Sequence, residues 1–102
     1  GIVAQLLEQN GYVKFANGLI LQWGFVSDNS NYSHVVNFSF NIAFAVTPYI
    51  VLPIQVFNKE HSSTFFNINP ITITNTKAIL WYGGYGNENS NTKGYYWLAC
   101  GI

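Results

Sequence analysis

The sequence predicts a small all-β domain, built as an antiparallel β-sandwich. Apolar and polar residues alternate with a period of two over several short stretches, and turn residues separate these stretches about every 8 to 12 residues, as in sandwich domains. No internal repeat and no long helical pattern interrupts this arrangement. With 102 residues, the chain has the length of a single domain.

The strongest local signal lies in residues 11–24. The dipeptide Asn17-Gly18 separates a short strand at 12–15 from a longer apolar strand at 19–23. Asn and Gly both tolerate positive φ, so this pair predicts a β-hairpin turn. In the second strand, apolar residues occupy both faces at positions 19 to 21. Such a strand is expected to be covered on both sides, by its own subunit or by a neighbouring one.

Residues 2–9 precede the hairpin and have apolar residues at the i, i+3, i+4 spacing of a helix. The dipeptide Asn10-Gly11 has the composition of a helix C-cap. A helix this short is not stable alone. The N-terminal residues are therefore expected to form a short helical or irregular leader.

The remaining strands follow from alternation and from proline. Residues 36–42 alternate strictly and predict a half-buried strand. Residues 49–57 are almost continuously apolar but contain Pro53, which predicts a bulged or edge strand. Further short strands are expected at 66–68, 71–74, 78–82 and 95–102.

The composition is apolar and nearly uncharged. Hydrophobic residues make up 49% of the chain, aromatic residues 18% and charged residues only 8%, compared with about 25% charged residues in an ordinary soluble domain. Because solubility depends on charge, this composition favours an assembly whose subunits share apolar surface. The net charge is zero and arginine is absent, which argues against binding to nucleic acid or to an anionic membrane surface. No stretch has the roughly 18 apolar residues of a membrane span.

The sequence has no signature of catalysis or of a cofactor. No GxSxG motif is present, only four carboxylates are available for acid–base chemistry, and the two histidines lack zinc-site spacing. Cys100 is the only cysteine, so it cannot form an intrachain disulfide and is interpreted as a small buried hydrophobic residue. We therefore expect neither an enzyme nor a metal site.

Three loops have the chemistry of sugar recognition. Aromatic faces stack on sugar rings, while amides and a few charges bind hydroxyl groups. The same residue types also form turns, so turn formation is the alternative explanation for each of them. The three tryptophans, Trp23, Trp81 and Trp97, lie in strand patterns and are assigned to the core or to an interface. The candidate ligand-binding residues are Asp28, Asn29, Asn31, Tyr32, Lys59, Glu60, His61, Tyr82, Tyr85, Asn87, Glu88 and Asn89.

Three segments resemble one known family. Residues 10–24, NGYVKFANGLILQWG, resemble the NGY-x-K-x-x-NGLI-x-QWG signature that opens the C-terminal tip domain of bacteriophage tail fibres. Residues 95–102, YYWLACGI, are similar to the strand that closes this domain. Residues 38–49 resemble its middle segment, although Asn41 stands where the family often has proline.

The resemblance implies a fold, an assembly and a function. It implies an H-type-lectin-like β-sandwich that forms a homotrimer at the distal tip of the fibre. Residues 1–10 would then be a leader from the fibre shaft and residues 11–102 the receptor-binding tip domain. The implied function is attachment of a virion to a bacterial host by non-catalytic binding of a surface glycan, with lipopolysaccharide as the expected partner. The alternatives are a structural trimerisation and capping domain without receptor contacts, or a free secreted lectin.

Overall fold

The computed structural model describes residues 1–28, 33–57, 65–85 and 92–102, without the side chains of 65, 66, 84 and 85. Every regular element in these residues is a β-strand, as the sequence predicts. None of the described residues forms a helix that could cross a membrane. In chain order the strands are β1 (Ile2–Leu6), β2 (Gly11–Phe15), β3 (Ile20–Ser27), β4 (His34–Ser39), β5 (Ile50–Phe57), β6 (Phe65–Ile73), β7 (Lys77–Tyr85) and β8 (Thr92–Gly101).

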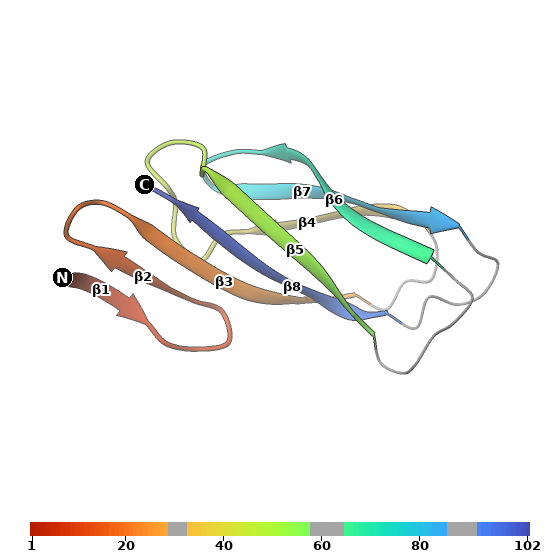
Figure 1. Ribbon diagram of the computed structural model, residues 1–102, viewed down its shortest axis with the longest axis horizontal. Helices are drawn as coiled ribbons and strands as arrows, with labels where there is room; N and C mark the ends of the chain where they lie inside the picture. Colours follow the sequence, from red (N-terminus) through yellow and green to blue (C-terminus); the bar gives the residue numbers. More distant parts are fainter. Residues whose placement is uncertain (29–32, 58–64, 86–91) are drawn as a thin grey trace.

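The strands form two facing sheets (Figure 1). Sheet A has five strands in the order β1-β2-β3-β8-β5, and sheet B has three in the order β4-β7-β6. Every neighbouring pair is antiparallel. The predicted antiparallel sandwich is therefore confirmed. The edge position expected for residues 49–57 is confirmed as well, because β5, which contains Pro53, is an outer strand of sheet A.

The helical prediction for the N-terminal residues is wrong. Ile2–Leu6 form β1, which pairs with β2 so that Leu6 lies opposite Tyr12. The backbone N–H of Ala16 also donates to the carbonyl oxygen of Gly1 at 2.8 Å. A helix this short gains little from its own hydrogen bonds. Pairing with the edge of β2 satisfies the same backbone groups and adds a strand to the sheet.

The hairpin around Asn17-Gly18 connects β2 to β3 through a three-residue loop. The N–H of Phe15 donates to the carbonyl oxygen of Leu19 at 2.8 Å, and the N–H of Gly18 donates to that of Phe15 at 3.0 Å. Gly18 has a φ of 94°, and the Asn17 side-chain oxygen accepts a hydrogen bond from the Leu19 N–H at 3.0 Å. The turn signal was correct, but the loop follows the three-residue pattern that places glycine in the left-handed region.

Replacing Gly18 with valine is expected to lower stability through the backbone alone. A Cβ at this position would meet nothing within 4 Å, so steric overlap adds no cost. The left-handed conformation costs an L-residue about 1–2 kcal/mol, and a β-branched residue tolerates it poorly. The melting temperature should fall by at least about 4 °C. The control Gly18→Asn should lose much less, because asparagine enters this region readily. An equal melting temperature for parent and valine variant would contradict the assignment.

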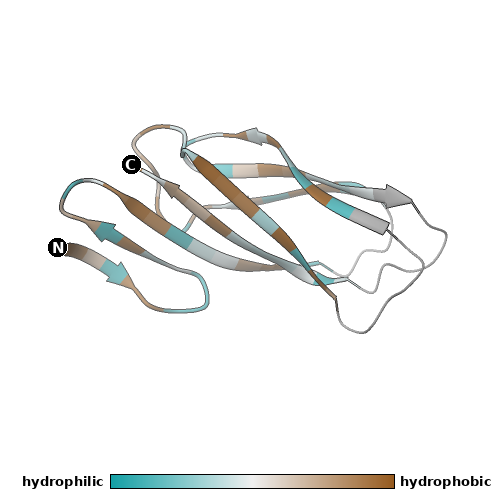
Figure 2. Cartoon of the chain, viewed as in Figure 1, coloured by the Kyte–Doolittle hydropathy of each residue, from teal (hydrophilic) through white to brown (hydrophobic). Residues whose placement is uncertain are grey.

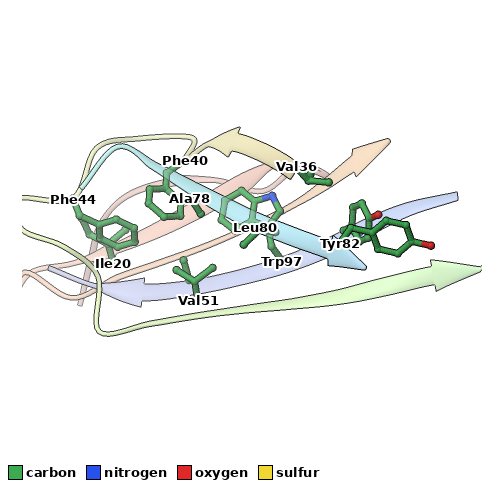
Figure 3. Packing of buried hydrophobic residues seen from close by; sticks show 11 residues of the cluster. Ile20, Val36, Phe40, Phe44, Val51, Ala78, Leu80, Tyr82 and Trp97 are labelled. Atoms are coloured by element: carbon green, nitrogen blue, oxygen red, sulfur yellow. The ribbon is translucent and has the colours of Figure 1, made fainter. Parts of the chain in front are cut away.

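The core fills the space between the inner faces of the two sheets (Figure 3). Trp97 of β8 stacks on Phe38 with ring centroids 4.7 Å apart, and Phe40 meets Trp97 edge-on at 5.7 Å. Phe40 lies beyond the end of β4, which stops at Ser39 rather than at residue 42 as predicted. The buried cluster comprises Ile20, Val36, Phe40, Phe44, Val51, Ala78, Leu80, Tyr82, Tyr95, Trp97 and Ala99.

Two amide side chains connect the segment after β4 to sheet A. Gln22 of β3 is fully buried; its nitrogen donates to the carbonyl oxygen of Ile42 at 2.8 Å and its oxygen accepts from the Ile42 N–H at 3.0 Å. Asn41 donates to the carbonyl oxygens of Gly11 at 2.7 Å and Trp23 at 2.9 Å. These four hydrogen bonds attach residues 41 and 42 to β2 and β3, so they hold the chain where it crosses from sheet B to sheet A.

Residues 65–73 form one strand where the sequence predicted two. A register shift between Pro70 and Thr72 marks a bulge in the pairing of β6 with β7. Proline lacks the N–H needed for a regular ladder, and a bulge at an edge strand accommodates it without ending the strand.

Candidate functional sites

One end of the sandwich brings together the described residues that flank the three undescribed segments. We call this the loop end; β3, β5 and β7 end there, and β4, β6 and β8 begin there (Figure 1). Phe57 pairs with Thr92, and the N–H of Asp28 donates to the carbonyl oxygen of Lys93 at 3.2 Å. Strand ends from both sheets therefore meet at the loop end.

The side chain of Asp28 forms an ion-pair contact at the loop end. Its Oδ2 lies 2.6 Å from Nε2 of His34, and the two side chains are 14% and 21% exposed. The His34 ring also meets the edge of Tyr82, with centroids 5.2 Å apart. Because Asp28 follows β3 and His34 begins β4, this contact ties sheet A to sheet B. Asp28 combines partial exposure with a fixed orientation, as a ligand contact requires.

Three hydrogen-bonded side chains, Gln55, Tyr82 and Thr92, lie next to the Asp28–His34 pair, because Tyr82 contacts His34. The Tyr82 hydroxyl lies 3.0 Å from the Thr92 hydroxyl. The Gln55 amide donates to Thr92 at 2.7 Å and to Tyr82 at 3.3 Å. Tyr82 is fully buried. Its role as a direct ligand contact is therefore corrected, because Ala78, Leu80 and Tyr82 all point inward from β7.

Tyr95 adds a second buried phenol to the loop end. Its ring packs against Tyr82 with centroids 5.7 Å apart, and its hydroxyl has no hydrogen-bond partner within the described residues. Burial raises the pKa of the Tyr95 phenol, and the nearby Asp28 carboxylate and Tyr82 raise it further. The phenol is therefore neutral throughout the physiological pH range. The sequence did not identify four residues of the loop end, although the alternation in β8 indicated that Tyr95 is buried. These residues are His34, Gln55, Thr92 and Tyr95.

The other candidate residues are placed only in part. Tyr85 ends β7, and its side chain is outside the described structure. Within the described residues, no group of three His, Cys, Asp or Glu side chains could hold a metal ion. The candidates outside the described residues are Asn29, Asn31, Tyr32, Lys59, Glu60, His61, Asn87, Glu88 and Asn89.

A second feature is the outer face of sheet A, which we call the apolar face. Strand register places apolar side chains of β3, β8 and β5 side by side in three rows. Figure 2 shows the concentration of hydrophobic residues along β5. Cys100 lies half-buried in one row rather than in the core. The rows are Leu21–Cys100–Ile50, Trp23–Leu98–Leu52 and Phe25–Tyr96–Ile54.

The apolar face is exposed in the single chain. Leu52 is 53% exposed, Ile54 62% and Leu98 44%. A hollow of about 350 Å³ lies between β5 and β8, lined by Leu52, Pro53, Ile54, Tyr96, Trp97 and Leu98. No charged residue stands in the three rows. This combination is typical of a surface that another protein covers.

Comparison with known proteins shows similarity to tail fibre proteins. A family model described as "Putative tail fiber protein gp53-like, C-terminal" matches residues 14–102. An N-truncated R2-type pyocin tail fibre is 22% identical with a TM-score of 0.76, over 97% of this chain and 37% of that one. An N-truncated R1-type pyocin tail fibre is 20% identical with a TM-score of 0.74, over 97% and 84%. A P. aeruginosa R2 pyocin fibre is 20% identical with a TM-score of 0.69, over 97% and 25%. No curated protein matches the sequence.

The two-sheet fold is therefore shared with C-terminal regions of tail fibres. The chain belongs to the family of gp53-like tail fibre C-terminal domains, because that model spans most of its length. The predicted family resemblance is confirmed, and with it a location in the C-terminal, distal region of a tail fibre. The chain spans only 37% of the R2-type fibre structure.

Proposed function

We propose that this domain is the trimeric tip of the fibre and attaches the particle to a bacterial host by non-catalytic binding of a surface glycan. The expected glycan is the polysaccharide of lipopolysaccharide. The main support for this proposal is that the apolar face and the loop end are separate surfaces. The apolar face lies along one sheet, while the partly exposed Asp28 and the strand ends that lead into the candidate loops lie at the end of the sandwich.

The apolar face supports assembly with further copies of the same chain. Its half-exposed aliphatic side chains would remain in contact with water in a single chain, and burying each one completely contributes about 1.5–3 kcal/mol. Because the chain carries so little charge, burying apolar surface between copies would also favour its solubility. Three copies arranged with this face inward would leave the loop ends together at the tip.

The loop end supports a role in recognition. The Asp28–His34 contact and the Gln55–Thr92–Tyr82 group hold the strand ends from both sheets in fixed positions. Rigid strand ends that present polar loops are the usual arrangement of protein recognition sites. Binding at a single loop end is expected to be weak, and three sites in one trimer would raise the overall strength by engaging several glycans at once.

A structural trimerisation and capping role is the second candidate, and the apolar face alone favours it. Assembly through the apolar face requires no receptor contact at the loop end. The two candidate functions differ in one respect: only the first requires the domain itself to hold the particle on the cell.

Cell attachment of the fluorescently labelled domain tests the proposed function. The parent should bind host cells, and delipidated lipopolysaccharide polysaccharide from the same host should compete. Asp28→Asn should weaken attachment roughly tenfold, the effect of losing one hydrogen bond to a charged group. The control Glu8→Gln removes a carboxylate from the connection between β1 and β2 and should attach normally. A trimeric parent that binds no cells would instead establish the capping role.

A further inference from the structure

The outer face of sheet B differs in chemistry from the apolar face. Trp81 stands in β7, the central strand of this sheet, and is 44% exposed. Its neighbours Leu80 and Tyr82 point into the core, so the indole points away from it. Of the three tryptophans, Trp97 is buried and Trp23 is half-buried on sheet A. The sequence predicted that all three tryptophans lie in the core or in an interface. Trp81 is not in the core, so its exposed position needs its own explanation.

The indole of Trp81 lies over Gly83, two residues further along the same strand. A Cβ at Gly83 would stand 2.5 Å from Nε1 of Trp81, 2.8 Å from Cε2 and 3.1 Å from Cζ2. These separations are shorter than a side chain allows, so the ring occupies space that only glycine leaves open. Glycine within a strand often marks such a close approach. The strand backbone thus supports one side of the ring, and the remaining surface faces solvent.

Amide side chains lie beside the ring on the β6 side. Strand register places Asn69 of β6 and Val35 of β4 opposite Trp81, and Asn67 opposite Gly83. Asn67 and Asn69 are exposed. Each carries one acceptor and two donor positions, which suits a ligand with many hydroxyl groups. Among the described residues of β4, β6 and β7 whose side chains point outward, the single charged residue is Lys77, which begins β7.

We propose that the outer face of sheet B is a platform for an uncharged pyranose ring of a surface polysaccharide. The ring would stack on Trp81, while Asn67 and Asn69 bind its hydroxyl groups. An aromatic surface beside a few planar amides fits this ligand class, because the apolar C–H face and the polar edge of a sugar need different partners. The apolar face of sheet A lacks such amides in its three rows and does not fit the same ligand.

This inference rests on the proposed function and adds a second contact surface to it. In a trimer that assembles through the apolar face of sheet A, the outer face of sheet B remains outside. A polysaccharide chain could then contact the loop end and the Trp81 platform through different sugar units. The two contacts would add to the strength of attachment in the same way as multiple subunits do.

Polysaccharide binding by tryptophan variants tests the platform. The probe is a panel of delipidated lipopolysaccharide polysaccharides, titrated against the assembled domain by calorimetry. Trp81→Ala should weaken binding about tenfold, equivalent to roughly 1.4 kcal/mol. Trp81→Phe keeps a smaller aromatic surface and should fall between parent and alanine variant. The control Ile71→Ala removes an exposed apolar side chain from the same sheet and should bind as the parent does.

Chemical footprinting supplies a second readout that does not depend on affinity. N-bromosuccinimide should oxidise Trp81 before the buried Trp97, and bound polysaccharide should protect Trp81. Unchanged binding by Trp81→Ala would overturn the platform while leaving attachment through the loop end intact. A Trp81 that resists oxidation as strongly as Trp97 without polysaccharide would also overturn it, because another subunit would then cover the ring. A parent that binds neither the panel nor host cells would overturn both proposals.

Discussion

Replacing Leu52 with glutamate is expected to convert the assembled domain into folded single chains. Leu52 lies at the edge of the apolar face, in register with Leu98, which in turn lies opposite Trp23. A charge buried there without a partner costs about 3–5 kcal/mol, and a trimer contains three copies of the substitution. In the single chain the same position is 53% exposed, so the fold itself should survive. Sedimentation velocity should show one chain at micromolar concentration, with the strand signal in circular dichroism retained.

Val35→Glu is the matched control for this experiment. Val35 is 52% exposed and lies on β4, an edge strand of sheet B, just as Leu52 lies on an edge strand of sheet A. The two substitutions therefore introduce the same charge at equal exposure on opposite faces. The control should remain assembled. If Val35→Glu dissociates the assembly and Leu52→Glu does not, then sheet B and not sheet A forms the interface.

Gln22→Leu is expected to cause the largest loss of stability within the single chain. The substitution preserves size but removes both hydrogen bonds to the backbone of Ile42. Each backbone group left without a partner costs about 1–3 kcal/mol, so unfolding should require about 2–6 kcal/mol less. The melting temperature should fall by roughly 10 °C or more.

Gln5→Leu provides the control, because Gln5 is an exposed glutamine on β1. It should melt within about 2 °C of the parent, as most surface substitutions do. Thermal denaturation followed by circular dichroism measures both variants. If Gln22→Leu melts as the parent does, leucine packing replaces the hydrogen bonds, and the segment after β4 is held by the aromatic core instead.

Much of the fold could be predicted because its signals are local. The Asn17-Gly18 turn, the alternation around Val36 and the proline in β5 each involve neighbouring residues whose backbone preferences are strong. Strand β1 could not be predicted in the same way. Its apolar spacing matches a helix, and only pairing with β2 decides the outcome.

The candidate site was predictable to a smaller extent, because it depends on contacts between distant residues. Asp28 was identified from its loop composition. The supporting contact between Gln55 and Thr92 joins residues 37 positions apart, which no local pattern indicates. Trp81 follows the alternation of its strand, but its exposure depends on which face of sheet B the core occupies.

We propose that the assembly covers the apolar face of sheet A and leaves the outer face of sheet B open. Hydroxyl-radical footprinting of the parent and of Leu52→Glu, read by mass spectrometry, shows which of the two faces is covered. We expect Tyr96 and Leu98 to be protected in the parent and to become reactive in the variant. Trp81 and Val35 should react equally in both. Protection of Trp81 and Val35 in the parent, together with reactive Tyr96 and Leu98, would show that sheet B and not sheet A forms the interface.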